Sequence, residues 1–302
     1  MTLPVTVIGG YLGAGKTTLV NQMLRQAGGV RIAVLVNEFG ELPIDEDLIE
    51  AQDDDLISIA GGCICCSFGN DLIAALQQIA ALQPCPDHIV IEASGVALPA
   101  AIANNVTLIK GMQLGGICVL VDAAAFTRQI RDEYIGDTVE RQLQEADIIV
   151  LSKSDLVPAQ SLRTVQDWLA DSWPGKPVIT AMQGRVPNEV LLGTIGSAEA
   201  RQAHPHADRD YDSILLAFDG PCDAATLAEM LSDPALGVIR AKGYVQDTSG
   251  RPALVQLAGQ RAEHSFPETA GRPGVICIGL KDRLDVQGLR ALQATLTAPV
   301  SS

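Results

Sequence analysis

The stretch VTVIGGYLGAGKTT, residues 5–18, decides the fold class. Its first six residues, VTVIGG, form an apolar run rich in Val and Ile, which is typical of a buried strand. The letters GYLGAGKT at 10–17 then fit G-x-x-x-x-G-K-[ST], and a helix-like stretch follows. A strand, a glycine-rich loop and a helix in this order predict a phosphate-binding loop, and a turn with an incidental Lys-Thr pair explains less of the pattern.

The residue types of this loop suit a nucleotide phosphate. The backbone of Gly10, Gly13, Ala14 and Gly15 can turn successive N–H groups toward one anion, and the following helix adds its positive N-terminus. We expect Lys16 to reach the β- and γ-phosphates. We expect the hydroxyl of its neighbour, Thr17, to coordinate Mg²⁺.

Short apolar runs alternate with helix-like segments through the first two thirds of the chain. The predicted strands are 5–10, 32–38, 88–94, 116–123 and 148–155, with 177–181 as the last, and 71–82 is a predicted helix. Each of the first five ends in polar or small residues, as buried parallel strands do where a functional loop follows. The alternation predicts an α/β fold with a mostly parallel sheet and helices on both faces.

A polar stretch at 197–210 has no apolar period, and we place a linker at 201–210. Beyond it, 211–220, 238–247, 253–264 and 274–280 resemble antiparallel strands, with helices near 224–231 and 285–298. The predicted organisation is therefore a P-loop domain at 1–200 and a small α+β domain at 211–302.

Composition excludes several classes of protein. The net charge of −15, from 36 acidic and 21 basic residues, argues against binding to nucleic acid or to an anionic membrane. Seven cysteines, an odd and unevenly spread number, indicate a reducing compartment. The N-terminus lacks signal-peptide features and no apolar run reaches ~18 residues, so we expect a soluble cytoplasmic protein.

The run SKSD at 152–155 bears on the choice of base. The Asp155 carboxylate can accept hydrogen bonds from N1–H and the 2-amino group of guanine, which adenine cannot donate. Lys153 can lay its stem over the ring. The alternative is an ordinary polar strand-to-helix turn, but the position at the end of a strand favours GTP over ATP.

Two carboxylates close predicted strands on the edge where the ligand is expected. Glu38 follows the second strand, and Glu92 closes the third, just before a Ser-Gly pair able to move toward a γ-phosphate. In P-loop enzymes such carboxylates hold Mg²⁺ directly or through water. Glu92 or Glu41 is our candidate for orienting the hydrolytic water, and no stronger base is evident.

The run GGCICCSFGN at 61–70 places Cys63, Cys65 and Cys66 together between glycines. The C-x-C-C spacing is not that of a thioredoxin redox pair, and clustered thiolates suit Zn²⁺ or Co²⁺. Three small buried hydrophobes are the alternative. That alternative fits Cys118 and Cys277 better, because both lie inside apolar runs. For His204 and His206 a solvated linker is favoured over an auxiliary metal site.

The ordered set GGYLGAGKTT, VNEFGE, GGCICC, IEASGVALP and SKSD resembles the CobW-like metallochaperone GTPases. These are related to the urease and hydrogenase nickel-insertion GTPases. VIRAKGYV at 238–245 resembles the R-x-K-G element of that family's C-terminal domain. Two departures are Ser152, where many members have Asn, and the absence of a long His-rich linker.

The resemblance implies a role for each matching residue. It implies phosphate binding at Gly13, Gly15, Lys16, Thr17 and Thr18, and base recognition at Lys153 and Asp155. It implies magnesium or switch roles at Glu38 and Glu92, and transition-metal binding at Cys63, Cys65 and Cys66.

The leading hypothesis is a slow GTPase that carries Zn²⁺ or Co²⁺ and transfers it to a client protein, with metal affinity higher in the GTP state. One alternative is a regulatory GTPase whose thiols sense metal or redox state and which signals by binding a protein. Another is an ATP-dependent small-molecule kinase with incidental cysteines. The client stays open, and a nucleotide-dependent homodimer is an option that relatives suggest.

Overall fold

The structure is a computed structural model that describes residues 2–37, 57–61, 70–193, 210–218, 220–267, 271 and 273–297. The chain divides into two compact units, Thr2–Leu192 and Gly193–Ser302. Each unit has its own sheet and its own apolar core.

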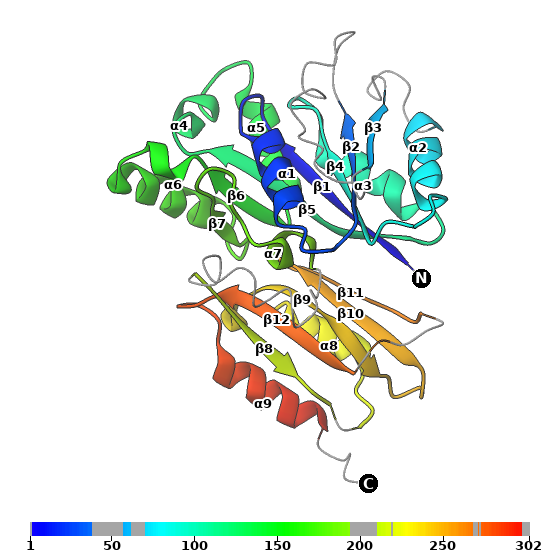
Figure 1. Ribbon diagram of the computed structural model, residues 1–302. Coiled ribbons are helices and arrows are strands. Elements are labelled where there is room, and N and C mark those ends of the chain that lie inside the picture. Colours follow the sequence, from blue (N-terminus) through cyan, green and yellow to red (C-terminus); the bar gives the residue numbers. More distant parts are fainter. Residues whose placement is uncertain are drawn as a thin grey trace. The chain divides into compact units, whose positions relative to one another are not determined.

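The first unit is built on a parallel sheet, drawn in Figure 1. Its seven described strands lie in the order β3-β2-β4-β1-β5-β6-β7. Their bounds are β1 Leu3–Gly10, β2 Ile32–Asn37, β3 Ile57–Gly61, β4 His88–Glu92, β5 Met112–Asp122, β6 Ile148–Ser152 and β7 Val178–Thr180. Every pairing among them is parallel, which confirms the predicted α/β class.

The predicted strands differ from the observed ones mainly at their ends. β4 ends at Glu92 and β6 at Ser152, because the residues after them leave the hydrogen-bonded ladder. β5 begins four residues before its predicted start, since Met112 already pairs with Leu3. β3 was not predicted.

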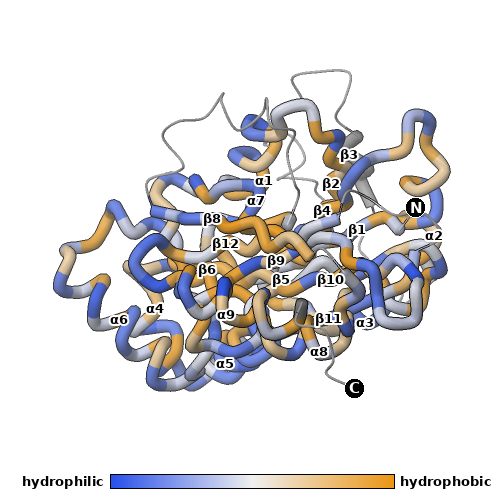
Figure 2. The backbone as a smooth tube through the Cα atoms, turned by 90° about the horizontal axis from the view of Figure 1, so that it is seen from below, coloured by the Kyte–Doolittle hydropathy of each residue, from blue (hydrophilic) through white to orange (hydrophobic). Residues whose placement is uncertain are grey.

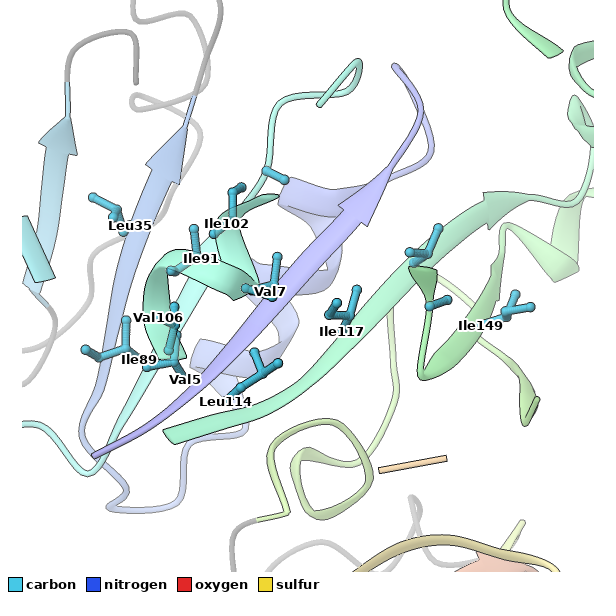
Figure 3. Close-up of a cluster of buried hydrophobic side chains, with 14 of the residues drawn as sticks. Val5, Val7, Leu35, Ile89, Ile91, Ile102, Val106, Leu114, Ile117 and Ile149 are labelled. Carbon is cyan, nitrogen blue, oxygen red and sulfur yellow. The ribbon is translucent and has the colours of Figure 1, made fainter. Parts of the chain in front are cut away.

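Helices lie on both faces of this sheet. Their bounds are α1 Lys16–Arg25, α2 Asn70–Ala80, α3 Pro99–Thr107, α4 Phe126–Gln129, α5 Gly136–Glu145, α6 Ala159–Ser172 and α7 Asn188–Leu192, with a 3₁₀ turn η2 at Ser154–Leu156. Figure 3 shows Ile102 and Val106 of α3 against strand residues such as Val7 and Ile91, while α1 lies on the opposite face. Burial of this apolar surface is the main driving force for the fold.

Strand order and register bring the polar strand ends together. β1 lies between β4 and β5, and in the register Ile8 pairs with Glu92 and Gly10 with Leu120. One strand further along, Asp122 pairs with Ser152. The carboxyl ends of β4, β5 and β6 therefore surround the loop that follows β1, which is where open α/β sheets bind ligands.

The second unit has a five-stranded antiparallel sheet in the order β11-β10-β9-β12-β8. Its elements are β8 Tyr211–Leu216, α8 Ala224–Leu231, η4 Pro234–Leu236, β9 Val238–Gln246, β10 Pro252–Ala258, β11 Arg261–Ser265, β12 Gly274–Leu280 and α9 Val286–Thr297. The predicted strand 253–264 is in fact a hairpin, since the chain turns at Gly259, whose φ is 57°. The α+β prediction for this part is confirmed.

The helices of the second unit cover one face of its sheet. Leu227 and Leu231 of α8 and Leu289 of α9 share a core with Ala241 and Val255 of the strands. Figure 2 shows helices of alternating hydropathy in both units. Within the described residues, no helix combines the length and apolarity needed to cross a membrane.

Candidate nucleotide site

The loop between β1 and α1 has a backbone that only glycine adopts readily. Gly13 and Gly15 have φ of 75° and 93°, and a Cβ on either would meet no atom within 4 Å. Gly10 is needed for a second reason, because a Cβ there would lie 2.6 Å from the carbonyl oxygen of Leu120 on β5. The loop is thus open above its centre and pressed against the sheet at its start.

The two polar side chains that begin α1 are held in place. The Lys16 ammonium donates to the Gly10 carbonyl at 3.0 Å, so it folds back over the loop. The Thr17 hydroxyl donates to Oε1 of Glu92 at 3.0 Å. Neither a side-chain cap nor an acidic residue occupies the first turn of α1, which leaves that turn with the positive potential of a helix N-terminus.

The segment after β4 lies directly on the P-loop. Glu92 is 4% exposed at the end of its strand. Three residues later, a Cβ on Gly95 would lie 2.5 Å from Cδ2 and 2.8 Å from the backbone nitrogen of Leu12. Only a glycine fits this approach, so the turn that carries it is in contact with the phosphate loop.

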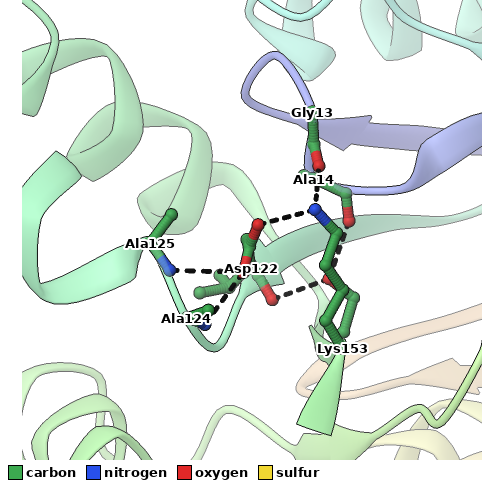
Figure 4. A network of polar contacts seen from close by, with 8 residues as sticks. Gly13, Ala14, Asp122, Ala124, Ala125 and Lys153 are labelled. Carbon is green, nitrogen blue, oxygen red and sulfur yellow. Dashed lines mark hydrogen bonds and ion pairs between the residues drawn. The ribbon is translucent and has the colours of Figure 1, made fainter. Parts of the chain in front are cut away.

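A second network joins the P-loop to the end of β6 (Figure 4). The Lys153 ammonium donates to the Gly13 carbonyl at 2.8 Å and pairs with Oδ2 of Asp122 at 2.7 Å. Oδ1 of Asp122 accepts hydrogen bonds from the backbone N–H groups of Ala124 and Ala125. Asp122 was missed by the sequence analysis, and its signal was an acid at the end of a strand on the ligand edge.

Ser152, the departure from the common Asn, makes its own contact with the loop. Its hydroxyl donates to the Ala14 carbonyl at 2.7 Å and also lies 3.1 Å from the Val121 carbonyl. The shorter side chain therefore still braces the P-loop.

Asp155 is exposed on η2, beside a loop that the sequence analysis did not single out. The Ser154 hydroxyl donates to the carbonyl of Ala181, which follows β7. A Cβ on Gly184, further along this loop, would lie 3.0 Å from the carbonyl oxygen of Thr18. The loop 181–185 thus connects the surroundings of Asp155 to α1.

Several predicted site residues lie outside the described part of the chain. These are Glu38, Glu41, Cys63, Cys65, Cys66, His204 and His206. Within the described part, no three His, Cys, Asp or Glu side chains gather as a metal site would require. Burial raises the pKa of Cys222 to about 11 and of Cys277 to about 12, so these two thiols stay protonated at neutral pH. As expected, Cys118 and Cys277 are fully buried.

The parallel sheet and its glycine loop define a P-loop nucleotide-binding protein. Residues 4–180 match the family described as CobW/HypB/UreG, nucleotide-binding domain, and residues 211–292 match the cobalamin synthesis protein CobW C-terminal domain. The chain belongs to the CobW-like GTPase family.

Named relatives extend over most of the chain. The zinc chaperone CobW of Sinorhizobium sp is 31% identical, over 99% of this chain and 97% of its own. The zinc chaperone YjiA of Escherichia coli K12 is 32% identical, over 80% and 81% respectively. A solved structure of a Zn(II)-bound triple mutant of the YjiA GTPase aligns over 98% of this chain and 99% of its own, at 25% identity and a TM-score of 0.46.

Proposed function

We propose that this protein is a GTP-hydrolysing metallochaperone that binds a transition metal through Cys63, Cys65 and Cys66 and transfers it to a client protein. The observation that carries the GTPase part is the convergence of the P-loop, Glu92 and Lys153 at one sheet edge. The chaperone part is supported by the zinc chaperones that match nearly the whole chain.

The phosphates of GTP would lie over the P-loop. A Cβ on Gly13 or Gly15 would meet no atom within 4 Å, so this part of the loop is open, and we expect the backbone of Gly13, Gly15, Lys16, Thr17 and Thr18 to bind the phosphates there. Lys16 is already folded over the loop, where its ammonium donates to the Gly10 carbonyl, and we expect it to bind a phosphate oxygen when GTP is present. Because the loop is preorganised, little of the binding free energy is lost in ordering it.

The residues at this edge suit Mg²⁺. The Thr17 hydroxyl and the Glu92 carboxylate lie 3.0 Å apart, and both are the hard oxygen ligands that Mg²⁺ prefers. Thr17 and Glu92 would hold the ion, with Glu38 as a third candidate. When bound, Mg²⁺ would neutralise charge on the phosphates. We also assign to Glu92, which is 4% exposed, the role of orienting the hydrolytic water.

Guanine would be recognised by Asp155 with Lys153 against the ring. The exposed Asp155 carboxylate is available to accept the two guanine N–H donors. Asp122 and the Gly13 carbonyl fix the Lys153 ammonium, which sets the position of the aliphatic stem. Adenine offers no matching donors, so this site should prefer GTP to ATP.

The transition metal is the cargo of this protein, and the three cysteines do not distinguish zinc from cobalt. Three thiolates bind Zn²⁺ and Co²⁺ in the same tetrahedral geometry. The names of the relatives favour zinc. Cys63, Cys65 and Cys66 lie in sequence between Glu38 and Glu92, so nucleotide state should alter their spacing and thereby metal affinity.

We assign the client-recognition role to the C-terminal domain, 211–302, joined by a linker at 201–210 to the GTPase domain at 1–200. A nucleotide-dependent homodimer would be consistent with this scheme. A regulatory GTPase that keeps its metal on hydrolysis is the competing function, and metal release distinguishes the two.

The test is a competitive titration of Zn²⁺ and Co²⁺ into the reduced protein, with Mg²⁺ and either GDP or a non-hydrolysable GTP analogue. We expect one metal equivalent to bind more tightly with the GTP analogue, and the Cys63/Cys65/Cys66→Ser variant to lose it. Cys85→Ser is the matched control, because Cys85 is an exposed thiol outside the motif. Equal affinity in both nucleotide states would contradict the gating, and binding unaffected by the triple substitution would contradict the assigned site.

A further inference from the structure

Gln142 on α5 uses its side chain to hold the turn that follows Glu92. The side chain is 1% exposed, and its amide nitrogen donates to the Gly95 carbonyl at 3.1 Å and to the Ala97 carbonyl at 2.8 Å. Both amide hydrogens are therefore spent on one turn. These hydrogen bonds should be costly to break, because the bond to Gly95 is buried and the bond to Ala97 is partly buried.

The same helix also fixes the far end of the turn. Oε2 of Glu145 accepts a hydrogen bond from the backbone nitrogen of Ala100 at 2.8 Å. Ala100 is the second residue of α3, where backbone N–H groups otherwise lack partners. Two side chains one helical turn apart thus attach residues 95–100 to α5.

The helix is a rigid support for these contacts. The Lys176 ammonium donates to the carbonyls of Leu143, Gln144 and Ala146 at the C-terminus of α5. A cation at this end also interacts favourably with the helix dipole. At the other end, Gly136 approaches the Ile130 carbonyl so closely that a Cβ would lie 2.8 Å from it.

The held turn is the one that touches the P-loop. Gly95 packs on Leu12, and Glu92, three residues before it, bonds Thr17. This turn contacts the phosphate loop and follows Glu92, the candidate magnesium ligand. It can respond to what occupies the phosphate site only if its own position is fixed. Gln142 supplies that definition from outside the nucleotide site.

We propose that Gln142 is a positioning residue for GTP hydrolysis and for the response of metal affinity to nucleotide state. It does not touch the substrate, and it acts by holding the Gly95–Ala97 backbone against the P-loop. This inference rests on the proposed GTPase function. Misplacement of a catalytic group by about 1 Å can cost on the order of 10²-fold in rate, so loss of both hydrogen bonds should be visible in kcat.

The direct test measures GTP hydrolysis and metal affinity in the full-length Gln142→Leu and Gln142→Glu variants. Leu removes both donors at similar volume, and Glu replaces them with oxygens that only accept. We expect kcat to fall by about 10- to 100-fold. KM for GTP should stay within about twofold, because the P-loop itself is unaltered. The ratio of zinc affinities between the GTP-analogue and GDP states should fall toward one. Gln144→Leu, on the exposed side of the same helix, should leave all three quantities unchanged.

A merely structural role would lower the unfolding temperature while leaving the KM-against-kcat pattern and the affinity ratio of the folded protein as in wild type. That result would overturn the proposal. If the Gln142 variants do not fold, Glu145→Gln and Glu145→Ala serve instead, since Gln retains an oxygen acceptor for Ala100 and Ala does not. We expect kcat to fall only in Glu145→Ala, and equal kcat in both would contradict the inference.

Failure of the inference is distinguishable from failure of the proposed function. Wild-type protein that hydrolyses GTP and binds zinc more tightly with the analogue, while Gln142→Leu does the same, would sink only the positioning role. Wild-type protein without either property would remove the proposed function and the inference together.

Discussion

The two sheets of this protein treat charged side chains in opposite ways. At the edge of the parallel sheet, Lys153 is paired with Asp122 and Glu92 is bonded by Thr17. On β9 of the antiparallel sheet, Lys242 is mostly buried, and burial together with nearby Arg240 lowers its pKa to about 8. On the neighbouring strand β10, Nε2 of Gln256, the register partner of Lys242, is buried and has no hydrogen-bond partner among the residues that the structure describes.

The difference between the two sheets indicates where side-chain positions are fixed without a bound ligand. Paired charges with several hydrogen bonds fix side-chain positions before a ligand arrives, which is what a binding site for a strongly charged ligand requires. A buried cation beside a second cation costs stability instead. The carboxyl edge of the parallel sheet therefore holds the preorganised polar side chains. On β9, the buried charge of Lys242 lowers the stability of the second unit.

The largest expected effect on GTP hydrolysis comes from substituting Lys16, at the carboxyl edge of the parallel sheet. Lys16→Ala removes the ammonium that we expect on the phosphates, so kcat/KM for GTP should fall on the order of 10²–10³-fold or more. Steady-state phosphate release measures this. The exposed Lys110→Ala is the charge-matched control and should behave as wild type. Hydrolysis within about threefold of wild type in Lys16→Ala would exclude the P-loop as the active site.

A smaller effect, on GTP affinity, is expected from substituting Asp122, and it tests the role of the ion pair between Asp122 and Lys153. Asp122→Asn keeps an oxygen for the N–H groups of Ala124 and Ala125 but removes the charge that holds Lys153. We expect GTP affinity to weaken by about 10-fold, in line with one lost charge-assisted contact. Competition binding with GTP and ATP checks this. Unchanged GTP affinity would show that Lys153 needs no anchor.

The smallest effect is expected on the β9 face, where the comparison becomes a stability measurement. The folded pKa of Lys242, about 8, lies below the ordinary 10.5, so the unfolded chain binds more protons between these two values. The contribution of this residue to stability is unfavourable below pH 8 and is relieved as pH rises from about 8 to 10.5. Lys242→Met should therefore stabilise the protein at pH 7, by the order of 1 kcal/mol.

Urea unfolding of wild type and Lys242→Met at pH 7 and pH 10 checks this. The gap between the two proteins should be larger at pH 7 than at pH 10. A variant less stable than wild type at pH 7 would show that the Lys242 charge is compensated.

Much of the fold followed from the sequence because buried parallel strands are short, continuous apolar runs. The strand ends at Glu92 and Ser152 fell within three residues of prediction. β3 was missed because its run, ISIAG, is only five residues long and leads directly into a glycine-rich stretch. The 253–264 hairpin was predicted as one strand because the turn between β10 and β11 is only two residues long.

The nucleotide site stays a prediction, and the sequence names candidate residues only where one short stretch holds them together. The candidate residues of the P-loop and of the run at 152–155 are contiguous in sequence, so each motif identifies them directly. Asp122 and Gln142 act across distances of 31 and 47 residues in sequence, on Lys153 and Gly95. On their own elements they are an acid at the end of a strand and a glutamine in a helix, so only the three-dimensional arrangement shows these contacts.

The most direct test of the account is the fate of bound zinc during a single turnover. Protein loaded with one zinc equivalent and GTP is mixed with Mg²⁺ and a chromophoric chelator, and phosphate release and zinc transfer are followed together. The account predicts that zinc reaches the chelator at the rate of hydrolysis and stays bound with the non-hydrolysable analogue. Zinc transfer at the same rate with GTP and with the analogue would contradict a nucleotide-gated carrier, and retention of zinc after hydrolysis would favour a regulatory switch.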